Sequence, residues 1–135
     1  MKRKTARKWS LLVLFGGLFC TGLGSAQQPV ARFFYDKRGN VSRQEKDTNR
    51  DGRMDRWIYY SGDGKIERVQ KDQDFDGKPD ISLFYEDGKP LRQEVSSQHD
   101  GRIDLRYFFD AGGEVERKEQ DTNGDGKPDI WVVYE

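Results

Sequence analysis

Three nine-residue segments of the sequence place oxygen-bearing side chains at alternating positions before a glycine. They share the pattern D-x-[DN]-x-D-G-x-x-D and span residues 47–55, 72–80 and 121–129. Side chains at positions 1, 3, 5 and 9, with the backbone carbonyl of position 7, would supply about six oxygens to a calcium ion, and the glycine permits a sharp turn. The predicted ligands are Asp47, Asn49, Asp51, Arg53 and Asp55; Asp72, Asp74, Asp76, Lys78 and Asp80; and Asp121, Asn123, Asp125, Lys127 and Asp129.

The same residue types also build turns that bind nothing, because Asp, Asn and Gly are the usual turn formers. Three copies in register favour the metal, since carboxylates crowded into nine residues repel one another without a cation. Magnesium requires a stricter octahedron, and transition ions would find no thiolate near the loops and a single histidine. We therefore expect about three calcium ions per chain.

A fourth segment, residues 96–104, is a degenerate copy of the pattern. Ser96 and Gln98 replace the first two ligands, so we expect this loop to be empty or very weak. His99, next to Asp100 and the two serines, could suggest a hydrolytic cluster, but adjacency in sequence does not supply triad geometry, and a surface turn residue is the favoured interpretation. No nucleophile–base pair or phosphate loop is visible elsewhere, so we do not expect an enzyme.

The loops recur with a nearly constant period. The glycines at position 6 are Gly52, Gly77, Gly101 and Gly126, spaced by 25, 24 and 25 residues, with one residue missing near the third loop. Such a period is typical of an array of one supersecondary unit. After each loop comes a segment rich in aromatic and β-branched residues, then a turn containing Asp or Gly, then a more charged segment.

This order predicts an all-β fold with about nine short strands in an antiparallel meander of 25-residue repeats. The first strands after the loops are expected at 56–60, 81–85, 105–109 and 130–134, and the second strands at 66–70, 91–95 and 115–119. Residues 31–35 and 41–45 supply the same hairpin without a preceding loop. The strands could form one twisted sheet, or a sheet that curls toward a barrel or solenoid.

Aromatic residues line up along the predicted strands. The rows are Trp57/Trp131 and Tyr59/Phe84/Phe108. Such rows could pack on one another as the sheet curls, which is favoured because little else can fill a core. Alternatively they could bind an envelope glycan or a partner protein on an open sheet.

The first 26 residues differ from the rest. Five basic residues precede a mostly apolar stretch from Trp9 to Leu23, and Gly24-Ser25-Ala26 offers a cleavage site. This layout predicts a helical signal peptide over 1–26 and a calcium-loop β-repeat domain over 27–135. An uncleaved anchor is the alternative, but the apolar run is shorter than the ~20 residues of a spanning helix. Lipidation of Cys20 is a second alternative, although Phe19 fits a lipobox poorly.

Cleavage would leave a secreted or periplasmic chain without cysteine. It keeps 19 of the 24 basic residues and all 24 acidic ones, so its net charge is −5, which makes it a poor nucleic-acid binder. Only 33% of the sequence is hydrophobic and 36% is charged, so order must come partly from something other than apolar burial. Metal binding can supply it, because ligand energy gained only in the folded state stabilises folding.

The loops resemble the D-x-D-x-D-G-x-x-D calcium motifs of thrombospondin type 3 repeats, dockerins and FG-GAP/VCBS repeats. Residues 121–133 are most similar to the last of these, where the loop also runs straight into an apolar strand. EF-hand helices are not expected, because the twelfth position is Ile58, Leu83 or Val132 rather than an acid. The hairpins loosely resemble bacterial YD and MORN-type sheet repeats. The resemblance implies calcium at the loop ligands and brings no enzymatic activity. Together with the leader at residues 1–26, it leads us to expect an exported bacterial repeat protein.

Overall fold

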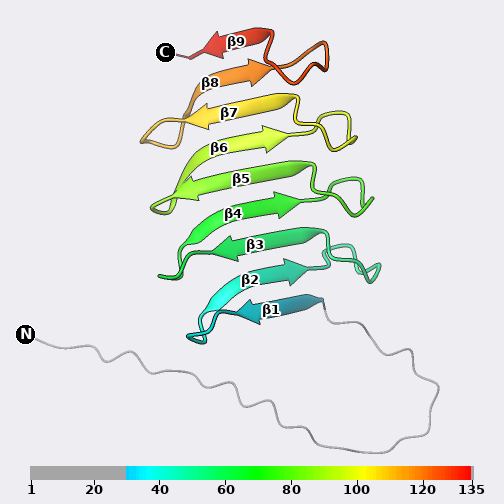
Figure 1. The fold of residues 1–135 in the computed structure, drawn as a ribbon, viewed down its shortest axis with the longest axis vertical. Coiled ribbons are helices and arrows are strands. Elements are labelled where there is room, and N and C mark those ends of the chain that lie inside the picture. Colours follow the sequence, from blue (N-terminus) through cyan, green and yellow to red (C-terminus); the bar gives the residue numbers. More distant parts are fainter. Residues whose placement is uncertain (1–29, 135) are drawn as a thin grey trace, which may run out of the picture.

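The computed structural model describes residues 30–134, which form one antiparallel sheet of nine strands in chain order (Figure 1). The strands are β1 (Ala31–Tyr35), β2 (Val41–Lys46), β3 (Arg56–Tyr60), β4 (Ile66–Lys71), β5 (Ile81–Glu86), β6 (Lys89–Val95), β7 (Leu105–Phe109), β8 (Val115–Gln120) and β9 (Ile130–Val133). Because β1 and β9 are opposite edges, the sheet is open and not a barrel. The predicted nine-strand meander is confirmed. The predicted signal peptide and Cys20 lie outside the described residues.

The connections at the two ends of the strands differ. Short turns join the strands of each hairpin at one end, and the acidic loops lie at the other end (Figure 1). We number these loops 1 (47–55), 2 (72–80), 3 (96–104) and 4 (121–129). The meander therefore stacks all four loops along one side of the sheet, where a side chain of one loop can reach the next. Within residues 30–134 there is no helix at all, and so none that could cross a membrane.

The hairpins contain a bulge just before the turn. In each of the four, the register shifts by one residue, as between Tyr59 and Tyr60 opposite β4. The β5–β6 turn is the shortest, with Asp87 and Gly88 both at positive φ (49° and 79°), as a two-residue hairpin loop requires. The interval from Gly77 to Gly101 is one residue shorter than the others because this turn is shorter, and loop 3 keeps its full length.

One face of the sheet carries the thin apolar core. Ile58 pairs with Val69, and Val69 pairs with Leu83, in the middle row of this face. Ile58 and Val69 are the only hydrophobic residues buried among those described, at 6% and 8% exposure. Large apolar side chains at both edges are exposed, including Tyr35 and Val133. A single-layer sheet cannot cover its own faces, which agrees with the low apolar content of the sequence.

Candidate metal loops and an arginine–aromatic face

In loops 1, 2 and 4, the aspartate at position 1 is buried and accepts hydrogen bonds from backbone N–H groups of its own loop. In loop 2, Asp72 is 5% exposed, and its two oxygens accept N–H bonds from Phe75 (2.7 Å) and Gly77 (2.8 Å). Asp47 and Asp121 accept the equivalent pairs of bonds in loops 1 and 4. A carboxylate has about four lone-pair positions, so each oxygen of Asp72 keeps one position for a cation.

The acid at position 9 holds the beginning of the loop. Asp80 is 2% exposed and accepts the N–H of Gln73 at 2.6 Å. Asp55 accepts the N–H and hydroxyl of Thr48 in the same way, and Asp129 accepts those of Thr122. The first and last predicted ligands therefore face into each loop. In Asp129, which is exposed, the Thr122 bonds hold the pKa of the carboxyl below its usual value.

The acids and amides at positions 3 and 5 lie at the exposed rim. Asp74 accepts the N–H of Asp76 (3.1 Å), and Asp76 accepts the N–H of Lys78 (2.7 Å). Loops 1 and 4 repeat this arrangement with Asn49 and Asn123 at position 3, Asp51 and Asp125 at position 5, and Arg53 and Lys127 at position 7. Each loop thus holds its predicted ligand residues in one turn through bonds between a side chain and the backbone two residues on.

Loop 2 has the most concentrated negative charge. Carboxylate oxygens of Asp72, Asp74 and Asp76 lie within 4.8 Å of one another. Burial raises the pKa of Asp72 above its usual 3.8, the N–H groups of Gly77 and Phe75 oppose this, and the neighbouring Asp74 raises it further. A bound cation would offset both the burial of the Asp72 carboxylate and its repulsion by Asp74. All four side-chain ligand positions in loop 2 are aspartates, whereas loops 1 and 4 have an asparagine.

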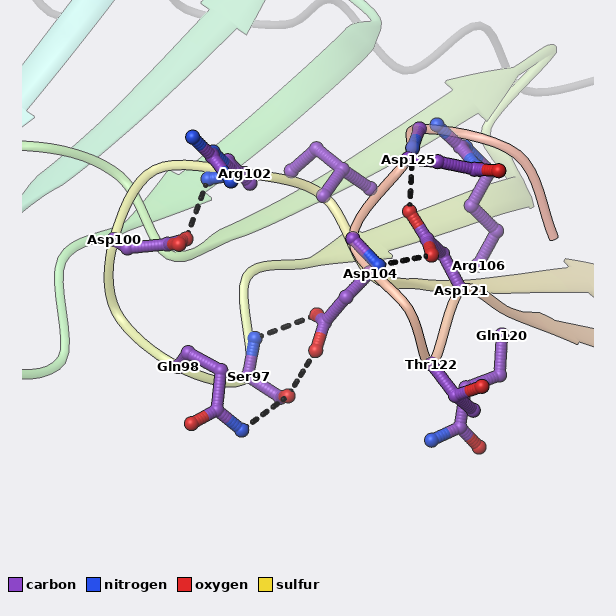
Figure 2. Close-up of a pocket in the computed structure, with 13 residues that line it drawn as sticks. Ser97, Gln98, Asp100, Arg102, Asp104, Arg106, Gln120, Asp121, Thr122 and Asp125 are labelled. Atoms are coloured by element: carbon purple, nitrogen blue, oxygen red, sulfur yellow. Dashed lines mark hydrogen bonds between the residues drawn. The ribbon is translucent and has the colours of Figure 1, made fainter. Parts of the chain in front are cut away.

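Loop 3 keeps the same shape with fewer charges. Ser96 is 1% exposed, and its hydroxyl accepts the N–H of Gly101 (3.1 Å) in place of an aspartate. Figure 2 shows Ser97 bonded to Asp104 through both its N–H and its hydroxyl. A recess of about 720 Å³ lies between loops 3 and 4 and is lined by residues of both, including Asp100, Asp121 and Asp125 (Figure 2).

His99 occupies position 4 of loop 3 and reaches toward loop 2. Its Nδ1 lies 2.9 Å from Oδ1 of Asp80, while the imidazole remains 41% exposed. The hydrogen bond to Asp80 raises the pKa of His99, and the nearby charges of Asp80, Asp74 and Asp76 act in the same direction. Nδ1 thus faces an acid in another loop rather than the adjacent serines. Sequence alone did not indicate this contact, because it depends on how two loops lie side by side.

The face opposite the core carries the predicted Tyr59/Phe84/Phe108 row, but sequence reasoning missed the arginines that lie between the rings. Aromatic residues on odd strands alternate with arginines on even strands: Phe34, Arg43, Tyr59, Arg68, Phe84, Arg92, Phe108 and Arg117. We call this the ladder face. Each guanidinium lies over the ring of its hairpin partner at 4.0–4.3 Å from the centroid. This is a cation–π arrangement, so arginine, not another ring, is the cross-strand neighbour of each aromatic.

Glutamates accompany three of these arginines. Arg43, Arg92 and Arg117 lie 3.1, 3.1 and 3.4 Å from the glutamate two residues further along the same strand, namely Glu45, Glu94 and Glu119. The pattern R-x-E in β2, β6 and β8 is the signal that could have predicted these pairs. Trp57 and Trp131 lie in the adjacent row of the same face, opposite Glu45 and Glu119 respectively.

Comparison with known proteins shows the fold alone. No family model matches the chain, and no curated protein matches it. Among solved structures, the chain is similar to TarM of S. aureus in complex with fondaparinux, alpha-GlcNAc-glycerol and UDP, at 16% identity and a TM-score of 0.55 over 79% of this chain. It is also similar to the GtfA/B complex, at 16% identity and a TM-score of 0.52 over 81% of this chain. The match spans 20% of either of those chains, so what is shared is a sheet architecture.

Proposed function

We propose that loops 1, 2 and 4 bind calcium and that the ions stabilise the antiparallel sheet. The observation that carries this proposal is the approach of Asp72, Asp74 and Asp76 in loop 2, whose carboxylate oxygens lie within 4.8 Å of one another. An all-oxygen donor set of this charge suits calcium better than a transition ion. The role assigned to the loops is structural rather than catalytic.

The energetic case rests on how little else holds the sheet together. Two buried hydrophobic side chains among the described residues provide a small core. A ligand present at ~100 times its dissociation constant stabilises the folded state by ~2.7 kcal/mol. Three such sites would be comparable with the whole stability of a small domain, about 5–15 kcal/mol. Ion binding is therefore large enough to decide whether the sheet is folded.

Calcium titration by calorimetry, with thermal unfolding in calcium and in EDTA, tests the proposal. We expect about three ions per chain, weaker binding of magnesium, and a melting temperature that EDTA lowers and calcium restores. Asp76→Asn should remove or weaken one site. Asp63→Asn is the matched control, because Asp63 is an exposed acid in the β3–β4 turn, away from the loops. Unchanged melting in EDTA would refute the structural role of calcium.

We further propose that the chain is exported to the periplasm or the medium. The support is the basic and apolar pattern of residues 1–26, ending in small residues. Intact-mass analysis of the exported protein tests it: an N-terminus at Gln27 is expected, whereas a lipid-modified Cys20 would establish the alternative anchor.

A second candidate function is suggested by the open ladder face. The sheet leaves this face without a second layer in the described part of the chain, and Trp131 on it is 58% exposed. Aromatic rings and arginines on a flat exposed surface suit binding to an envelope glycan or a protein. Binding of such a partner would add recognition to the structural role of calcium and does not compete with it.

A further inference from the structure

The arginine of β4 differs from the other three arginines of the ladder face. Arg68 stacks on Tyr59 at 4.1 Å as the others stack on their rings. Two residues further along its strand, however, stands Gln70 where β2, β6 and β8 have glutamate. The Nε of every ladder arginine is buried without a well-aligned hydrogen bond. Within residues 30–134, Arg68 is the only one of the four ladder arginines that also has no carboxylate within ion-pair distance of its guanidinium.

The residues opposite Arg68 and Gln70 on the neighbouring strands are not acids. Phe84 pairs with Arg68 from the next strand, while Trp57 and Ser82 lie on either side of Gln70. The Gln70 amide donates to the Ser82 hydroxyl at 3.0 Å, so it is turned across the strands rather than toward Arg68. This patch, composed of Trp57, Arg68, Gln70 and Ser82, is half-buried and combines a cation, two hydrogen-bonding groups and a flat indole.

We propose that this patch is a subsite for the carboxylate of an acidic glycan, with Arg68 as the anchoring residue. The inference rests on the second candidate function and specifies its ligand. A guanidinium binds a carboxylate through two parallel N–H bonds, which a lysine cannot do. Its stacking on Tyr59 fixes the orientation of the guanidinium before the ligand arrives, so less entropy is lost on binding.

The remaining side chains favour a sugar over other carboxylates. A pyranose ring presents C–H groups that can lie against the Trp57 indole and hydroxyls that can bond to an amide and a hydroxyl. The ladder face has an excess of positive charge, since Arg32 and Arg106 join its four ladder arginines against Glu45, Glu94 and Glu119, while Glu86 at the end of β5 is opposite Lys89. A uronate-containing chain complements both the sugar contacts and the positive charge, whereas a neutral glycan complements only the contacts with Trp57, Gln70 and Ser82.

Titration of the protein in calcium buffer with hyaluronan oligosaccharides, followed by tryptophan fluorescence and calorimetry, tests the proposal. Neutral chitin oligosaccharides of equal length and poly-glutamate are the comparison ligands. We expect binding of the uronate chain that weakens with added salt. The decisive variant is Gln70→Glu, which supplies Arg68 with the partner that the other arginines have. It should keep the fold and weaken binding by about tenfold or more.

Glu94→Gln is the matched variant, because it removes the partner of Arg92 and should raise affinity or add a second site. If the uronate chain binds Gln70→Glu as tightly as the unmodified protein, the face binds glycans but Arg68 is not the anchor. If poly-glutamate binds as tightly as the uronate chain, the glycan assignment is wrong. If neither glycan binds, this inference and the glycan-binding form of the second candidate function are both refuted.

Discussion

Nδ1 of His99 in loop 3 lies 2.9 Å from Oδ1 of the buried Asp80 in loop 2. The only histidine of the chain, in the degenerate loop 3, therefore contacts a predicted ligand of loop 2. Burial raises the pKa of Asp80, but the N–H of Gln73 and the imidazole of His99 outweigh it, so the pKa ends below its usual value of 3.8. The pKa of His99 moves the opposite way, above 6.5.

These shifts predict a pH dependence of stability when calcium is absent. Because the folded-state pKa of His99 is raised, its contribution is fully present below pH 6.5 and is lost as the pH rises through the folded value. The contribution of Asp80 is present above pH 3.8 and is lost as the pH falls below it. In EDTA, the gap in melting temperature between the unmodified protein and His99→Asn should therefore be widest at mildly acidic pH and shrink toward about pH 8.5.

The control is His99→Lys, whose charge does not change over this range. The gap between this variant and His99→Asn should stay constant between about pH 6 and 8.5. An NMR titration of the imidazole protons provides the pKa directly, and a value at or below 6.5 in EDTA would contradict the interaction with Asp80.

Loop 3 should regain an ion when its missing ligands are restored. The double variant Ser96→Asp/Gln98→Asp recreates the pattern of loop 2, and the Ser96 position already has the N–H of Gly101 that an aspartate would accept. Calorimetry should show one more calcium ion per chain. In EDTA the same variant should melt lower than the unmodified protein, since the added carboxylates face Asp100 and Asp104 without a cation.

Gln98→Asp alone is the control, because it supplies position 3 and leaves position 1 as serine. It should not add an ion. An unchanged stoichiometry in the double variant, with the fold intact by circular dichroism, would show that the loop pattern is not sufficient for calcium.

Local sequence signals were enough to predict the sheet. Turn residues and aromatic segments repeat along the chain, and each strand pairs with its sequence neighbours, so no long-range pairing had to be inferred. The predicted bounds of 56–60 and 105–109 agree with β3 and β7. The loop ligands could be placed together for the same reason, since they lie within nine residues.

Contacts that depend on register or on neighbouring loops could not be predicted. Strict alternation would place Arg43 on the same face as Val41, and therefore beside Tyr35. The bulge between Phe34 and Tyr35 instead leaves Val41 opposite Tyr35 and moves Arg43 opposite Phe34. The whole ladder face follows from this one-residue shift, because each hairpin repeats it. His99 was missed because its partner is in another loop.

Position 4 of every loop has a left-handed backbone, although only one loop has glycine there. Arg50, Phe75 and His99 have φ of 65°, 64° and 56°, and Gly124 has 76°. This conformation costs a residue with a side chain about 1–2 kcal/mol. Replacing that residue by glycine removes the cost, but the greater freedom of glycine in the unfolded chain cancels part of the gain. Phe75→Gly should therefore stabilise the protein by about 0.5–1 kcal/mol, and Gly124→Ala should destabilise it by a similar amount.

Urea unfolding in EDTA measures both changes without the contribution of calcium. The Phe75 ring is 40% exposed, so its removal costs little packing. A Cβ at Gly124 meets no heavy atom within 4 Å, so the cost of Gly124→Ala is that of the backbone alone. Phe75→Asn is the control for chain entropy, because asparagine tolerates positive φ but is less flexible than glycine when unfolded. If both Phe75 variants destabilise the protein, the ring contributes more to stability than the left-handed backbone costs, and the predicted gain from Phe75→Gly is wrong.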